Sequence, residues 1–414
     1  EISLGLVGSE MCIRDRPRGP TPLFGCTYTA NMTQTEQGEA LPAEHRGGWM
    51  HFLKAIASMS GDLSKMTAPS FILSPVSLTE YPSYWGEHPA SFVDVQNGAT
   101  PEERMIAVLR WFIGTLKGQY TSRNTSMGSE KKPLNPVLGE LFYGNWPAQG
   151  ELGETTLVSE QVSHHPSITA YFLENAKAGV SVEGHSGQKT SFTGRSIRVV
   201  QVGHAFMRLQ RPEGVETYLI TLPTLSIDGL WFGSPYIELT DSSYIYSSSG
   251  LTAKIHYSGR GYFTGKPHSF TATVTPSSSP SSKPIFQASG IWSGKSTVDE
   301  STVVPAQGEF WDADAHAREE VHVKPLEQQG EYESRRLWQT VSRGIKSGDY
   351  DIASKDKSRI ENEQRALRKK REHDGTKHVP KHFVLVENDP EYARLVVPSK
   401  HVPAGQDSFR FQRT

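Results

Sequence analysis

Apolar residues recur at helical spacing where the first clear pattern of the chain begins. Trp49, Phe52, Leu53, Ile56 and Met59 fall on one side of a helix with 3.6 residues per turn, and polar residues lie between them. The spacing predicts a short amphipathic helix. The pattern leaves two interpretations open: a surface helix docked on a core, or a movable segment that docks on either protein or lipid.

A second helix is predicted over residues 101–119. Pro101 suits the first turn of a helix, and Glu102 and Glu103 lie near the positive end of its dipole. Its apolar stripe consists of Met105, Val108, Leu109, Phe112 and Leu116. A stripe of this width indicates that the helix lies against a large core.

Between residues 140 and 310 the period changes to two. Residues 251–257 alternate apolar with polar side chains, and residues 270–274 do the same. Clusters of Gly, Pro and Ser separate such segments, and residues 276–284 are rich in Pro and Ser, as in an exposed hairpin loop. No helical pattern intervenes that would support parallel strands. An antiparallel sandwich or barrel is therefore predicted.

Helical spacing returns after residue 321. Leu337, Val341 and Ile345 are four residues apart, and Gly348 is a predicted stop signal. A polar helix is predicted over residues 354–373. Because it has few apolar positions, we expect it to pack along one narrow edge and to leave most of its charged surface in water or facing a ligand.

Composition changes this picture mainly by exclusion. The 414 residues contain 43 Lys and Arg against 45 Asp and Glu, which gives a formal charge of -2. No global field attracts nucleic acid, so an anion site has to be local. The two cysteines, Cys12 and Cys26, lie in residues 1–48, which we interpret as a disordered or non-native leader. With no long apolar run, we expect a cytosolic protein.

Two adjacent histidines are the first candidate for chemistry. His164 and His165 follow Ser163, but neighbouring side chains on a strand point to opposite faces, which disfavours a shared metal ion. Ser163 lacks the sequence context of a catalytic nucleophile. Two interpretations remain: structural histidines, or a grip on a phosphate, since imidazoles donate hydrogen bonds to phosphate oxygens. No metal and no cofactor are expected.

Two further polar groups could join such a grip. Lys132 and Asn135 lie in a proline-stiffened segment, which is either an ordinary connector or a preformed basic loop. Lys357, Glu361 and Arg365 follow at i, i+4 and i+8, within about 80° on one helix face. They form either an exposed ion-pair ladder or part of a ligand site.

Residues 160–166 (Glu-Gln-Val-Ser-His-His-Pro) resemble the signature of the oxysterol-binding protein family, with Ser167 in place of a second Pro. We expect this departure to affect only a flanking turn. Residues 132–140, 258–263 and 333–338 match further motifs of the family in the same order. The chain resembles most the short fungal members, which consist of the lipid-binding domain alone.

The resemblance implies an α+β, mainly β fold: a large, nearly closed antiparallel β-barrel with a lipid tunnel. It divides residues 49–414 of the domain into a lid (49–68), a helical segment (69–139), the barrel (140–320) and a C-terminal helical region (321–414). The tunnel of this family takes a sterol or phosphatidylinositol 4-phosphate. We expect a monomer that contacts Golgi or endoplasmic reticulum membranes peripherally and binds no nucleic acid.

The resemblance also implies roles for single residues. The phosphoinositide headgroup would contact Lys132, Pro133, Leu134, Asn135, His164, His165, Lys357, Glu361 and Arg365. The sterol would contact Trp49, Gln119 and Arg123. The lid would touch the ligand through Leu63, Ser64, Lys65, Met66, Thr67 and Ala68. Residues 184–188 lack an Asn of the family pattern, a departure that bears on sterol preference.

The predicted function is non-vesicular exchange of the two lipids between membranes, without enzymatic activity. The alternative is a sterol or phosphoinositide sensor that regulates Golgi trafficking without net transport. A lipid hydrolase or phosphatase lacks both a Cys-x5-Arg loop and a nucleophile elbow in this sequence.

Overall fold

The computed structural model describes residues 46–58, 63, 68–127, 131–259, 265–399 and 402–413. All of them belong to one compact unit, residues 35–414. The leader was predicted over residues 1–48. Residues 1–45 lie outside the described residues, and residues 46–48 belong to the first helix.

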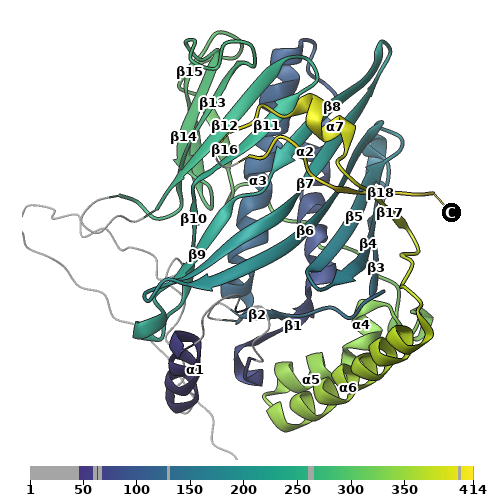
Figure 1. The fold of residues 1–414 in the computed structure, drawn as a ribbon. Helices are drawn as coiled ribbons and strands as arrows, with labels where there is room; N and C mark the ends of the chain where they lie inside the picture. The colour runs from purple at the N-terminus through teal and green to yellow at the C-terminus, as the bar shows by residue number, and fades with distance from the viewer. Residues whose placement is uncertain are drawn as a thin grey trace, which may run out of the picture. The chain divides into compact units, whose positions relative to one another are not determined.

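One antiparallel sheet of 14 strands dominates the described part of the chain (Figure 1). From one edge to the other its order is β16-β15-β14-β13-β12-β11-β8-β7-β6-β5-β4-β3, while β9 pairs with β7 and β10 with β9. The strands are β3 (Leu141–Trp146), β4 (Thr155–His164), β5 (Ser167–Asn175), β6 (Val180–Phe192), β7 (Ile197–Arg211), β8 (Gly214–Thr221), β9 (Thr224–Asp228), β10 (Tyr236–Thr240), β11 (Ser242–Ser247), β12 (Leu251–Ser258), β13 (Ser269–Pro276), β14 (Phe286–Ile291), β15 (Lys295–Ser301) and β16 (Glu309–Asp312). The fold class is the predicted one, with the edge strands β3 and β16 unpaired with each other among the described residues.

The period of two that predicted these strands separates their buried and exposed faces. In β12, Ala253, Ile255 and Tyr257 are buried, whereas Lys254 and His256 are exposed. The neighbouring strand follows the same rule, because buried Ala272 lies opposite Ile255. In this part of the sheet alternate residues therefore face the main core, whereas strands such as β8 are buried on both faces, with Tyr218 and Ile220 in the main core and Leu219 in a second cluster. The Pro- and Ser-rich loop between β13 and β14 lies where it was predicted.

The long helix α3 (Pro101–Met127) begins at the predicted Pro101 and continues past the predicted end at residue 119. It contacts β10, β12 and β16 and fills the core of the sheet with residues such as Phe112 and Leu116, both fully buried (Figure 1). A short helix, α2 (Pro89–Asp94), packs on α3. The sheet and α3 together thus supply the main hydrophobic core.

Residues 69–139, expected as a helical segment, contain more than the helices α2 and α3. They also contain two strands, β1 (Leu73–Ser77) and β2 (Lys132–Leu134), which pair in parallel, with Leu73 opposite Lys132. Two 3-10 helices, η4 (Ser70–Ile72) and η5 (Leu78–Gly86), flank β1. Sequence analysis did not predict these elements, because strands of five and three residues and 3-10 helices carry no clear hydrophobic period.

The C-terminal region is helical first and then mixed. Its helices α4 (Ser334–Leu337), α5 (Gln339–Ser347) and α6 (Tyr350–Asp374) are followed by a hairpin of β17 (Phe383–Val386) and β18 (Ser408–Phe411), which flank α7 (Pro390–Leu395). Gly348 ends α5 in the left-handed conformation, as predicted. In α6 only Ala353 and Ile360 are buried, so this helix packs along the narrow edge that its sequence indicated.

Candidate ligand cavity

A largely apolar cavity of about 260 Å³ opens between the inner face of the sheet and the elements that cover it. Its walls come from β5, β6, β7, β9 and β10, and α1 (Arg46–Ser58), η5 and α3 complete the lining. Apolar groups such as Ile197, Val199 and Leu225 account for most of the surface. A cavity with a mostly apolar lining favours an apolar ligand.

The amphipathic helix α1 covers one side of the cavity with the residues that predicted it. Trp49, Phe52 and Ile56 line the cavity, and Leu53 is fully buried. The indole nitrogen Nε1 of Trp49 donates a hydrogen bond of 2.9 Å to the carbonyl oxygen of Leu230. Because Leu230 follows β9, this bond joins the covering helix to the rim of the sheet.

The segment that follows α1 contributes part of the predicted lid. Leu63 is buried and lines the cavity, whereas Ala68 is buried in a cluster with Ile72 and Leu134. The other predicted lid residues, Ser64, Lys65, Met66 and Thr67, lie outside the described residues.

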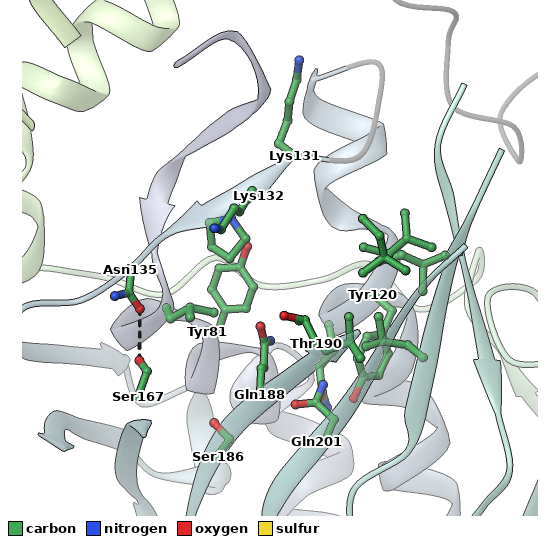
Figure 2. Close-up of a pocket in the computed structure, with 18 of the residues that line it drawn as sticks. Tyr81, Tyr120, Lys131, Lys132, Asn135, Ser167, Ser186, Gln188, Thr190 and Gln201 are labelled. Atoms are coloured by element: carbon green, nitrogen blue, oxygen red, sulfur yellow. Dashed lines mark hydrogen bonds between the residues drawn. The ribbon is translucent and has the colours of Figure 1, made fainter. Parts of the chain in front are cut away.

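Polar side chains from α3, β6 and β7 form one part of the cavity lining. Gln119 on α3 donates a hydrogen bond of 2.9 Å to the hydroxyl of Thr115 and lines the cavity. Gln188 and Thr190 of β6 also face the cavity, and Gln201 lies opposite Gln188 on β7 (Figure 2). The side chain of Arg123 lies outside the described part of α3.

Sequence analysis singled out residues 184–188 only through the family resemblance and did not name the polar residues of β6 as cavity residues. Ser186, Gln188 and Thr190 recur at every second position, so a strand must show all three on one face. Polar residues at alternate positions on a strand usually indicate a solvent face, which is why this signal did not suggest a cavity wall. Gly187 between them is required for close packing, because a Cβ atom there would approach the carbonyl oxygen of Ser167 to 2.8 Å.

The basic segment after α3 reaches the opposite part of the lining. Lys131, Lys132, Pro133 and Asn135 all line the cavity. The ammonium of Lys131 donates a hydrogen bond of 2.9 Å to the carbonyl oxygen of Phe71, and burial lowers its pKa. Leu134 points elsewhere: it is fully buried in the cluster that α5 and α6 share with β1.

Ser167 has a larger role than the expected flanking turn. It begins β5, lines the cavity, and donates a hydrogen bond of 3.1 Å to Oδ1 of Asn135 (Figure 2). Its hydroxyl also accepts a hydrogen bond of 2.9 Å from Nε2 of Gln161. Ser167 therefore fixes the Asn135 side chain at the cavity, a contact that a proline at this position could not make.

The two histidines lie beside this basic segment. Nδ1 of His164 is 3.2 Å from the carbonyl oxygen of Pro136, and the rings of His164 and His165 meet edge to face with centroids 4.6 Å apart. His165 is exposed, and neither ring lines the cavity itself. Burial lowers the pKa of His164, and the charge of its neighbour His165 lowers it further.

Helix α6 brings the third predicted group toward the histidines. Glu361 raises the pKa of His164 and Arg368 lowers it, which indicates that this face of α6 lies close to the ring. Lys357 donates a hydrogen bond to Glu361, and Nη2 of Arg365 lies 3.5 Å from Glu361. The three predicted residues thus form an ion-pair ladder next to the histidines and outside the cavity lining.

A buried carboxylate holds the basic segment in place. Glu140 is fully buried and accepts hydrogen bonds from the backbone nitrogen of Val137 (3.0 Å), the Thr79 hydroxyl (2.6 Å), the Ser334 hydroxyl (2.8 Å) and the Trp338 indole (2.9 Å). These donors come from the loop after β2, from η5 and from α4 and its C-cap. Glu140 therefore ties the wall of the cavity to the C-terminal helices.

The fold and the cavity together define a protein with a largely apolar cavity between its sheet and a covering amphipathic helix. Residues 50–401 match a family model described as oxysterol-binding protein. The chain belongs to the oxysterol-binding protein family. It is 56% identical to Protein KES1 of Mycosarcoma maydis over 382 residues, which cover 92% of this chain and 98% of that one. It is 49% identical to Protein kes1 of Schizosaccharomyces pombe over 350 residues, which cover 83% and 89%.

Solved structures agree with this assignment at the level of the fold. A structure of the Osh1 ORD domain in complex with cholesterol covers 86% of this chain and 85% of its own with a TM-score of 0.68 and 20% identity. The Osh3 ORD of Saccharomyces cerevisiae in complex with PI(4)P covers 85% and 90% with a TM-score of 0.63 and 21% identity. Among the described residues of the present chain, no helix has both the length and the apolar character to cross a membrane.

Proposed function

We propose that this chain is a lipid transfer protein that binds a sterol or phosphatidylinositol 4-phosphate in one cavity and exchanges them between membranes. The observation that carries the proposal is a mostly apolar cavity covered by an amphipathic helix and bordered by a basic segment. The Osh1 and Osh3 domains with the same fold were solved with cholesterol and PI(4)P, respectively, and the relatives are highly similar over nearly their whole length.

The physical reason for such a carrier is the cost of moving a lipid through water. For about 400 Å² of apolar surface at ~25 cal/mol/Å², the penalty is roughly 10 kcal/mol. The cavity replaces the contacts that the lipid loses on leaving the bilayer. In our proposal α1 is the lid: it opens to admit a lipid at the membrane and closes over the ligand during diffusion.

A sterol would place its hydroxyl at the polar part of the cavity. Gln119 supplies both a donor and an acceptor there, and Gln201 lies nearby on β7. Trp49 would cover the apolar body of the sterol. Arg123, the third sterol residue that the resemblance implies, stays a prediction.

A phosphoinositide would instead place its headgroup beside the basic segment. Lys132 and Asn135 line this part of the cavity, and His164 and His165 lie next to it. The Lys357–Glu361–Arg365 ladder would supply further charge if a phosphate competed with Glu361 for the two cations. Charge-assisted hydrogen bonds of this kind contribute about 1.5–3 kcal/mol each, and a sterol hydroxyl cannot replace them.

Transfer between two vesicle populations tests this proposal. Purified protein should move many sterol molecules per protein, and phosphatidylinositol 4-phosphate in the acceptor vesicles should accelerate that movement. Binding that stops at one lipid per protein, with no transfer, would support the alternative of a sensor. We further propose that the protein acts as a monomer at Golgi or endoplasmic reticulum membranes.

A further inference from the structure

Two aromatic side chains at one tip of the sheet are exposed although apolar groups of this size are usually covered. Between β9 and β10 the chain forms the turn Gly229-Leu230-Trp231-Phe232-Gly233, called the aromatic turn below. Phe232 is 88% exposed and Trp231 is 44% exposed, while Leu230 of the same turn is buried. Phe232 has the largest exposed fraction given for any large apolar residue in the described part of the chain.

The aromatic turn is a rigid structure that holds these side chains outward. Gly229 and Gly233 adopt left-handed conformations with φ of 73° and 70°, and a Cβ at position 229 would approach the carbonyl oxygen of Ser234 to 2.2 Å. The indole of Trp231 donates a hydrogen bond of 3.3 Å to the carbonyl oxygen of Gly194, in the turn between β6 and β7. Exposure of the aromatic pair is therefore built into the fold.

The position of the aromatic turn relates it to the cavity and to its cover. Leu230 lines the cavity and accepts the hydrogen bond from Trp49 of α1. Figure 1 shows α1 next to the end of the sheet where β9 and β10 turn. The exposed aromatic pair thus lies at the side of the cavity where α1 covers it.

Basic residues outnumber acidic ones around the aromatic turn, although Asp228 directly precedes it and Glu238 and Asp241 follow in β10 and after it. Residues 46–58, 186–198 and 229–237 contain no Asp or Glu, whereas they contain the basic residues Arg46, Lys54, Lys189, Arg195 and Arg198. Of these, Arg198 forms an ion pair of 2.8 Å with Asp241. An aromatic tip with exposed basic residues such as Lys54, Lys189 and Arg195 on the neighbouring segments fits the interface of an anionic bilayer, where Trp and Phe prefer the boundary between headgroups and acyl chains.

We infer that the aromatic turn inserts into the surface of an anionic membrane and sets the end of the cavity that α1 covers against the bilayer. The inference rests on the proposed function, in which the ligand is taken from one membrane and delivered to another. It adds Trp231 and Phe232 as the residues that contact the membrane. Phe232 penetrates the acyl boundary, Trp231 lies at headgroup depth, and the basic residues face the lipid phosphates. A membrane that displaces α1 at this place would open the Trp49–Leu230 bond next to the inserted turn.

The test compares Phe232→Ser and Trp231→Ser with Val215→Ser, which removes a half-exposed apolar group on β8, opposite Gln210 at the far end of β7 from the aromatic turn. Each variant is floated with vesicles of phosphatidylcholine and phosphatidylserine, and sterol uptake from cyclodextrin is measured without any membrane. Because Phe232 is exposed, thermal unfolding should match that of the wild type and verify folding.

We expect Phe232→Ser to weaken vesicle binding by about tenfold, since the transfer of one large apolar side chain corresponds to roughly one decade in affinity. Val215→Ser should float like the wild type, and all variants should take up sterol from cyclodextrin equally. Unchanged flotation of both aromatic variants would overturn the inference, as would a wild-type protein that fails to float. If the wild type takes up no sterol, the proposed function is contradicted. The flotation result tests the role of the aromatic turn independently of sterol uptake.

Discussion

The hydrogen bond between α1 and the aromatic turn predicts how fast a bound lipid escapes. Trp49 is 7% exposed, and its indole nitrogen donates to the carbonyl oxygen of Leu230 at 2.9 Å. Trp49→Phe removes this donor and keeps an aromatic ring against the ligand. If α1 must move away before a lipid leaves, the substitution should accelerate release.

The structure also sets the size of the effect. The backbone nitrogen of Gly233 donates to the same Leu230 oxygen at 3.2 Å, so the carbonyl keeps a partner when Trp49 loses its own. The penalty of an unsatisfied buried acceptor therefore does not apply, and the loss is that of one neutral hydrogen bond, about 1 kcal/mol. That energy corresponds to a release rate about fivefold higher.

Release of a fluorescent sterol from preloaded protein into excess cyclodextrin measures this rate. Trp231→Phe is the matched control, because its indole donates to the Gly194 carbonyl oxygen on the exposed surface and has no contact with α1 among its described hydrogen bonds. It should release sterol at the wild-type rate. Equal release rates for Trp49→Phe and the wild type would refute the role of this hydrogen bond in closure.

Three other perturbations give distinct outcomes. Replacing His164 and His165 together by Ala should abolish extraction of phosphatidylinositol 4-phosphate from liposomes and spare sterol extraction; undiminished phosphoinositide extraction would remove their proposed role. Glu140→Gln should lower the free energy of unfolding by about 2–4 kcal/mol in denaturant titrations, because a buried acceptor becomes a donor facing donors, whereas Glu300→Gln on the surface should change little. Burial lowers the pKa of His204 to about 4, so the unfolded chain takes up this proton at a higher pH than the folded chain. The contribution of neutral His204 to the free energy of unfolding is therefore complete above pH 6.5 and is lost as the pH falls from 6.5 toward 4. The free energy of unfolding should fall less steeply with pH in His204→Gln; the same slope in the variant and the wild type would exclude His204 as a contributor.

Elements with a long, regular period were predictable from the sequence. The helix around Trp49, the helix from Pro101 and the strand over residues 251–258 all lie where their apolar residues recur. One side of each of these elements packs against a core, so the positions of their apolar residues in the sequence coincide with their buried positions. The short strands β1 and β2 were missed because tertiary contacts alone, such as the pairing of Leu73 with Lys132, define them.

Sequence analysis named several residues that line the cavity, but it did not give their arrangement, and their roles toward a ligand stay predictions. Gln119, Lys132 and Asn135 line the cavity, whereas the histidines and the Lys357–Glu361–Arg365 ladder are not among its lining residues. A linear sequence does not reveal which of several polar groups share one surface. Nor does it show that Glu160, the first residue of the histidine motif, is buried under the backbone nitrogens of Lys381 and His382 at 2.7 and 2.8 Å.

The central claim is that one cavity holds either of two lipids. Native mass spectrometry of the protein incubated with sterol and phosphatidylinositol 4-phosphate together tests it most directly. The account predicts two complexes, each with one lipid per chain, whose proportions shift as the ratio of the two lipids is changed. A complex that contains both lipids on one chain, or a protein that takes up neither, would contradict it.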